Sequence, residues 1–261
     1  MTKKNTPLVV SYSGGKDSTW LIHHLLKTRR KIAAVLFFDG GWEYDELRQH
    51  HYDVQEQTGL KIIPVRPLLD YDTCFSKIAV TANTDHPDEH VKAGQLRHLG
   101  YGWPDQRRRW CTDLKTRALD AAAKRICPGV PHAIGLTADE TPRLLTTRQV
   151  WLRERGLVEY PLVDAGCTQQ NALDECRKTG YTWGGLYNHF NRISCWCCPL
   201  RSITDWRNLR HHYPYYWQRL RQMQAECPAH HCAINHGSTV EDLETRFAGE
   251  DNGTPTKTKH A

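Results

Sequence analysis

Residues 8–26 read Leu-Val-Val-Ser-Tyr-Ser-Gly-Gly-Lys-Asp-Ser-Thr-Trp-Leu-Ile-His-His-Leu-Leu, and this stretch decides the fold. Its first part is a short apolar run with β-branched residues, which predicts a buried strand. Its second part repeats apolar side chains at the spacing of one helix face. A strand that turns through two glycines into a helix leaves backbone N–H groups unpaired, and the helix dipole adds positive potential there. The stretch therefore predicts an anion site between a strand and a helix.

The side chains of the bend suit a phosphate group. Ser13 and Ser18 offer hydroxyl donors, Lys16 offers a positive charge, and the two glycines let the backbone approach an anion closely. The pattern Gly-x4-Gly-Lys-Ser/Thr is missing, so the bend is not a Walker A loop. An acid beside bound phosphate makes sense mainly when Mg²⁺ is present, and Asp17 directly follows the lysine.

Residues 13–18, Ser-Gly-Gly-Lys-Asp-Ser, resemble the pyrophosphate loop of the N-type ATP pyrophosphatases. Members of that family cleave ATP between the α and β phosphates, adenylate a substrate and release pyrophosphate. The resemblance implies ATP and Mg²⁺ as ligands; the alternative is a glycine-rich turn that binds nothing. The nucleotide-binding residues implied are Ser11, Ser13, Gly14, Gly15, Lys16, Asp17, Ser18, Asp39 and Gly135.

Three further segments resemble motifs of the 3′-phosphoadenosine-5′-phosphosulfate (PAPS) reductase family. Residues 37–43, Phe-Phe-Asp-Gly-Gly-Trp-Glu, place Asp39 near the nucleotide or its metal, with a helix cap as the alternative. Residues 109–115, Arg-Trp-Cys-Thr-Asp-Leu-Lys, bring cations toward phosphate, and a helix is expected to start near Lys115. Residues 135–143 keep the family's glycine, glutamate and arginine, but Thr137 stands where an arginine is common. The catalytic residues implied are Lys16, Asp17, Asp39, Lys115 and Arg143.

Composition limits the class of protein. The chain has 261 residues, a formal net charge of +6 and ten cysteines. The positive net charge weakly favours polyanionic ligands such as ATP or nucleic acid. No apolar run reaches the roughly 18 residues of a membrane helix, and no signal peptide is evident, so we expect a cytoplasmic protein without membrane contact. Cysteines in that compartment are more often thiols or metal ligands than disulfides.

The alternation of strand and helix patterns over residues 8–165 predicts an α/β fold with a doubly wound parallel sheet. The resemblance implies a Rossmann-like sheet of the adenine nucleotide alpha hydrolase-like kind. We expect a pyrophosphate-loop ATP pyrophosphatase domain at 1–165, a smaller Cys-rich helical region at 166–247, and a disordered tail at 248–261.

Residues 195–198, Cys-Trp-Cys-Cys, contain a Cys-x-x-Cys spacing that lets two thiolates reach one metal. Residues 187–199 resemble a segment of sulfur-handling family members, several of which hold a [4Fe–4S] cluster. The resemblance implies Cys111, Cys195 and Cys198 as ligands. The fourth ligand is left open between Cys197, Cys227, Cys232 and an uncoordinated iron position. Zn²⁺ and unligated thiols are the alternatives.

Arginines alternate with aromatic residues over 201–221, which is typical either of nucleic-acid contact or of a helix packed on a core. We favour packing, with Trp206, Leu209 and Leu220 turned inward.

Three functions fit these motifs. The first is an ATP pyrophosphatase in sulfur transfer to nucleic acid, such as DNA phosphorothioation, with DNA or RNA as substrate and a cysteine desulfurase or other sulfur-modification proteins as partners. The second is a thiol-dependent reductase of PAPS or adenosine 5′-phosphosulfate. Such reductases carry Glu-Cys-Gly-Leu-His, where residues 226–230 read Glu-Cys-Pro-Ala-His. The third is a non-catalytic nucleotide-binding subunit.

Overall fold

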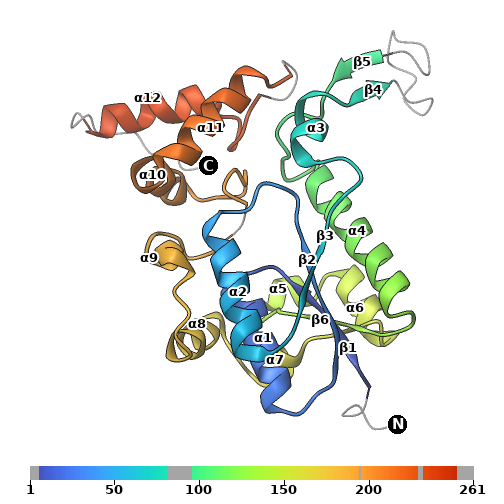
Figure 1. Ribbon diagram of the computed structural model, residues 1–261. Helices are drawn as coiled ribbons and strands as arrows, with labels where there is room; N and C mark the ends of the chain where they lie inside the picture. The colour runs from blue at the N-terminus through green and yellow to red at the C-terminus, as the bar shows by residue number, and fades with distance from the viewer. Residues whose placement is uncertain (1–5, 82–95, 194, 229–231, 252–261) are drawn as a thin grey trace. The chain divides into compact units, whose positions relative to one another are not determined.

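The computed structural model describes residues 6–81, 96–193, 195–228 and 232–251 (Figure 1). The chain forms two compact units, one of Met1–Pro67 with Leu114–Ser194 and one of Leu68–Asp113 with Cys195–Ala261. Each unit therefore combines segments that are distant in sequence. The division of the sequence at residue 165 into a catalytic domain and a helical region stays a prediction.

The first unit contains a five-stranded parallel sheet in the order β3-β2-β1-β6-β7. Its strands are β1 (Leu8–Tyr12), β2 (Ile32–Phe38), β3 (Ile62–Val65), β6 (His132–Ile134) and β7 (Val158–Glu159). Pro64 lies in β3 at one edge of the sheet, where its missing N–H costs no ladder bond. The predicted α/β fold with a parallel sheet is confirmed.

β1 occupies the centre of the sheet and is the most buried strand. Val10 pairs with Val35 of β2 on one side and with Ala133 of β6 on the other. The chain first builds β2 and β3 outward from β1 and later returns to place β6 on its other side. The strand order therefore reverses between β1 and β6. Parallel sheets bind ligands beyond the carboxyl ends of the strands at such a point, and the bend at residues 13–18 follows β1 directly there.

Helices flank this sheet, with α1 (Lys16–Lys27) and α2 (Glu46–Thr58) on one side and α4 (Trp110–Ile126) on the other in Figure 1. The remaining helices of this unit are α5 (Thr141–Leu144), α6 (Thr147–Glu154), α7 (Pro161–Asp164), α8 (Gln169–Lys178), η2 (Trp183–Gly185) and α9 (Leu186–His189). α1 packs against α7 and α8. α4 starts five residues before the expected position at Lys115, because the helical turn already begins at Trp110.

The second unit is mainly helical. It holds α3 (Tyr71–Ser76), an antiparallel pair of β4 (Ala79–Thr81) and β5 (Leu96–Leu99), α10 (Ile203–His212), α11 (Pro214–Ala225) and α12 (Val240–Asp251). Its core is aromatic: Trp196 stacks on Tyr216, and the Trp103 indole N–H donates to Gln224 Oε1 at 3.0 Å. Trp206, Leu209 and Leu220 are fully buried, which confirms their predicted packing role.

The expected tail at 248–261 is partly covered by the structure. α12 continues through residue 251, and residues 252–261 lie outside the described part. Among the described residues, no helix is long and apolar enough to span a membrane.

Candidate nucleotide site and cysteine segment

The bend between β1 and α1 has the backbone that its glycines predict. Gly14 has φ +80°, a left-handed conformation that side-chain-bearing residues rarely adopt. Gly15 is extended and precedes Lys16, the first residue of α1. An added Cβ at Gly14 would lie 3.0 Å from the His51 Nε2 atom, so both conformation and space require glycine here.

The two serines of the bend bond to each other and not outward. The Ser18 hydroxyl donates to the Gly15 carbonyl at 3.0 Å and accepts from the Ser13 amide at 3.1 Å. Since one hydroxyl carries one proton, the Ser13 hydroxyl donates in the 3.0 Å contact between the two side chains. The serines therefore shape the bend, and their predicted nucleotide contact stays a prediction.

Lys16 is a buried cation, with 4% of its surface exposed. Its Nζ lies 3.3 Å from Asp17 Oδ2 and 3.3 Å from Gln169 Oε1. A buried ammonium needs such polar partners because burial removes its hydration. The arrangement keeps a positive charge fixed at the first turn of α1.

Asp17 has one satisfied and one unsatisfied oxygen. Its Oδ1 atom is buried and has no hydrogen-bond partner among the described residues. Burial raises the pKa of Asp17, and the neighbouring Lys16 only partly opposes that shift. A buried carboxylate oxygen without a donor is the kind of ligand that a hard cation such as Mg²⁺ takes. The site therefore fits the Mg²⁺ that the sequence predicts.

The loop after β2 carries two carboxylates of different character. Asp39 Oδ2 accepts from Arg66 Nε at 2.8 Å, and the Arg66 side chain is largely exposed. Glu43 folds back on the loop and accepts from the Gly41 amide at 2.9 Å. Burial raises the pKa of Glu43, and the nearby Lys115 lowers it. Lys115 therefore lies in the electrostatic neighbourhood of this loop.

Three other predicted site residues have partners in the first unit. Ser11 in β1 bonds His132 Nδ1 at 3.0 Å. Arg143 forms an ion pair with Glu140. An added Cβ at Gly135 would lie 3.0 Å from the Ser18 backbone, so this glycine lets β6 approach the first turn of α1. The structure thus brings Gly135 to the bend and gives Ser11 and Arg143 protein partners.

Three residues of the segment 169–187 contact the bend and are not among the site residues predicted from sequence. The Lys16 amide donates to the Tyr187 hydroxyl at 2.7 Å, and the Trp183 indole N–H donates to the Gly14 carbonyl at 2.8 Å. Gln169 contacts Lys16 as described above. These residues lie more than 150 positions from the bend, and no periodicity or spacing in the sequence links them to it.

The cysteine segment belongs to the second unit. Residues 195–198 form a turn in which the Cys198 amide donates to the Cys195 carbonyl at 3.1 Å. Cys197 is fully buried, and burial raises its thiol pKa well above the usual value. Cys111 and Cys198 raise that pKa further, so the thiols are electrostatic neighbours.

In the described ranges, no three or more cysteine, histidine or carboxylate side chains are placed to hold one metal ion. The thiols of Cys111, Cys195, Cys197 and Cys198 therefore share a neighbourhood without forming a ligand set as folded. Their metal-binding role stays a prediction.

The sheet and its flanking helices define a Rossmann-like α/β protein, with the bend at residues 13–18 beside the point where the strand order reverses. Residues 7–201 match the phosphoadenosine phosphosulfate reductase domain family. The chain belongs to this family.

Two relatives illustrate the range of similar proteins. An uncharacterized protein of Methanocaldococcus jannaschii is 23% identical over 235 residues, which cover 88% of this chain and 44% of that protein. The chain thus spans less than half the length of that relative. A solved structure, the U34-tRNA thiolase NcsA from Methanococcus maripaludis with its [4Fe-4S] cluster, aligns over 99% of this chain and 77% of that chain at 14% identity, with a TM-score of 0.43.

Proposed function

We propose that this protein binds ATP at residues 13–18 and cleaves it between the α and β phosphates. An acceptor takes the adenylyl group, and pyrophosphate leaves. The proposal is supported by the position of the bend, at the amino end of α1 and beyond the carboxyl end of β1. A helix amino end offers unpaired N–H donors and a positive dipole end, which suit a pyrophosphate group.

The pairing of buried Lys16 with half-satisfied Asp17 is the observation that carries the proposal. The Lys16 ammonium would stabilise the negative charge that develops on pyrophosphate as the bond to the α-phosphorus breaks. Bound Mg²⁺ would neutralise phosphate charge and orient the phosphate oxygens. Asp17 would hold that ion, joined by Asp39 once Arg66 releases its carboxylate.

The acceptor we infer is a nucleic acid, in which sulfur takes the place of the adenylated oxygen, and that oxygen departs as part of AMP. Family membership and the cysteine segment support sulfur chemistry, and the net charge of +6 suits a polyanionic substrate. The motif resemblance favours members that modify DNA with phosphorothioate, with a cysteine desulfurase as the source of sulfur. Among the described residues, the thiols are not placed to hold one metal ion together. Iron and zinc analysis of the purified protein tests whether they bind either metal.

A thiol-dependent reductase of PAPS is the second candidate, because the matching family carries that activity in its name. Its nucleophile would be Cys227. Burial raises the pKa of Cys227 to about 12, and the neighbouring Cys232 adds to this shift. A thiol of that pKa is almost entirely protonated near neutral pH, whereas the nucleophile must be a thiolate. This difference favours adenylation over reduction.

The two activities are separated by their products. With ATP, Mg²⁺ and a nucleic-acid acceptor, we expect pyrophosphate release that Lys16→Ala reduces by about 100-fold or more, the loss typical of one electrostatic transition-state contact. Lys178→Ala, at an exposed position paired with Glu175, is the matched control and should release pyrophosphate at the wild-type rate. Sulfite release from PAPS with a dithiol would instead establish the reductase. Full activity in Lys16→Ala would refute the proposed mechanism.

A further inference from the structure

The Tyr187 hydroxyl bonds a backbone N–H at the amino end of α1. It accepts the Lys16 backbone N–H at 2.7 Å. Lys16 is the first residue of α1, so this N–H is one of the donors that a helix leaves unpaired at its amino end. One N–H has one proton, so it cannot bond Tyr187 and a phosphate at full strength together. If the bend binds phosphate, this contact has to be exchanged.

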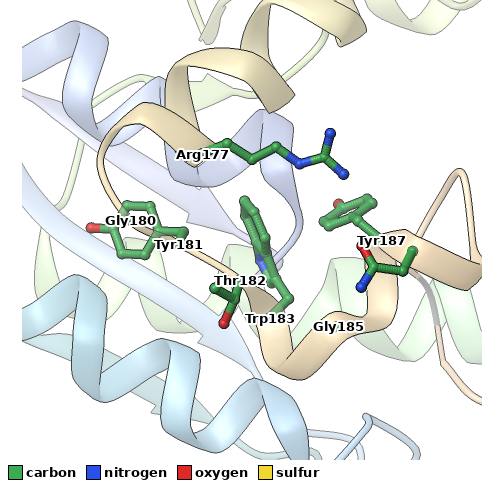
Figure 2. A pocket seen from close by; sticks show the side chains of 8 residues that line it. Arg177, Gly180, Tyr181, Thr182, Trp183, Gly185 and Tyr187 are labelled. Carbon is green, nitrogen blue, oxygen red and sulfur yellow. The ribbon is translucent and has the colours of Figure 1, made fainter.

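The phenol is held closely against the bend. Its oxygen lies 3.3 Å from the position of an added Cβ on Gly15, and the Lys16 Nζ lies 5.6 Å from its ring centre. The ring also meets Trp183 edge to face, with centres 4.7 Å apart at 84°. The two rings and Arg177 line a cavity of about 260 Å³. Figure 2 shows these three side chains around it. The cavity therefore lies directly beside the phenol.

The backbone between the two aromatic residues has left-handed φ angles. Trp183, Gly184 and Gly185 have φ values of +50°, +58° and +85°. Left-handed φ is unfavourable for tryptophan, and the bond from its indole to the Gly14 carbonyl helps to hold it. The two glycines that follow adopt such angles and others freely. Rotation there would release Tyr187 while Trp183 stays bonded to the bend.

We propose that Tyr187 gates the phosphate site: its hydroxyl and a bound pyrophosphate group compete for the Lys16 amide, and Tyr187 swings away about Gly184 and Gly185 when the ligand binds. This inference rests on the proposed function, because it takes residues 13–18 as the phosphate site. It adds a residue that limits affinity for the ligand in the free protein.

Binding of inorganic pyrophosphate to the full chain, measured by calorimetry with Mg²⁺, tests the gate. Tyr187→Phe removes the competing hydroxyl and keeps the ring, so we expect about two- to tenfold tighter binding, the value of one net hydrogen bond. Tyr181→Phe is the matched control, because the Tyr181 hydroxyl bonds His23 Nε2 at 2.8 Å and not the bend. Its affinity should equal that of the wild type. Equal or weaker binding by Tyr187→Phe overturns the gate.

Hydrogen exchange in the wild type provides a second readout. Pyrophosphate should accelerate amide exchange in residues 185–190 if the segment is released, and unchanged or slower exchange contradicts the gate. Failure of both Tyr187→Phe and the wild type to bind pyrophosphate overturns the gate together with the phosphate site. Pyrophosphate binding and gating without ATP cleavage would support the gate and refute only the proposed function.

Discussion

His50 and Thr19 join α2 to α1 through a hydrogen bond of 2.9 Å between the imidazole Nε2 and the hydroxyl. Both side chains are buried. Burial lowers the pKa of His50 to about 3, and the nearby His51 and His23 act in the same direction. The imidazole is therefore neutral in the folded protein throughout the physiological range.

Stability should consequently fall in mild acid. A histidine in the unfolded chain has a pKa of about 6.5, whereas folded His50 stays neutral well below that pH. The unfolded chain therefore binds a proton that the folded protein does not bind, and the free energy of unfolding falls as the pH drops below about 6.5. Between about pH 7.5 and pH 5.5 this residue accounts for a loss of about 1.4 kcal/mol. In urea unfolding, we expect the free energy of unfolding of His50→Gln to fall less steeply between these two pH values, by about that 1.4 kcal/mol. His211→Gln, at an exposed position, should keep the wild-type slope.

Gly135→Ala should disturb the bend at residues 13–18, although Gly135 lies far from the bend in sequence. The added Cβ would lie 3.0 Å from the Asp17 carbonyl carbon and from the Ser18 Cα, and backbone atoms cannot rotate away. We expect a loss of about 1–3 kcal/mol in stability, typical of overpacking, and weaker pyrophosphate binding. Gly249→Ala in α12 is the control, because an added Cβ there has nothing within 4 Å. Equal effects of both changes on binding would contradict this role for Gly135.

The sequence predicts the strands, helices and turns that depend on local residue patterns. The apolar run, the two glycines and the helix spacing of residues 8–26 predict β1, the bend and α1, and the structure contains all three. Pro64 favours either an edge strand or a strand end for residues 60–65, and β3 lies at the edge of the sheet. Strand and helix patterns of this kind depend on neighbours within a few residues, so they can be interpreted without knowledge of the tertiary structure.

The contacts that complete the bend could not be predicted in this way. Tyr187 and Trp183 reach it across more than 165 residues, and Ser13 and Ser18 bond each other within the bend. These hydrogen bonds depend on the folded geometry of the bend, which the sequence pattern does not specify. The same holds for the thiols, whose proximity depends on how residue 111 meets residues 195–198.

Asp17→Asn should remove the metal dependence of nucleotide binding. Burial raises the pKa of Asp17, so binding of Mg²⁺ to the ionised carboxylate must displace a proton, and affinity should rise with pH until that carboxyl is ionised without the metal. The amide of asparagine carries no charge to titrate. Calorimetry with α,β-methylene-ATP should therefore show pH-dependent Mg²⁺ enhancement in the wild type and in the control Asp164→Asn, but not in Asp17→Asn. An unchanged enhancement would exclude Asp17 as a metal ligand.

The cysteines should differ in their effect on metal content. Cys197 is fully buried with a strongly raised thiol pKa, which suits a small core residue, whereas Cys111 and Cys198 are partly exposed. We expect Cys197→Ala to keep the iron or zinc of anaerobically purified protein, and Cys111→Ala and Cys198→Ala to lower it. Metal loss in Cys197→Ala alone would reverse this assignment. Absence of metal from the wild type would leave unligated thiols as the correct alternative.

Trp206→Ala should unfold the second unit without a specific effect on nucleic-acid contact. The Trp206 side chain is fully buried in α10, and truncating a buried tryptophan costs about 3–5 kcal/mol.

The arginines near Trp206 have carboxylate partners of their own: Arg207 bonds Glu250 at 2.6 Å, and Arg219 bonds Asp72 at 3.1 Å. Packing of the aromatic side chains and ion pairs of the arginines within the unit thus account for the alternation of the two residue types. Arg207→Ala should accordingly leave the salt dependence of DNA and RNA binding at the wild-type slope, since a lost phosphate contact would reduce that slope by about one.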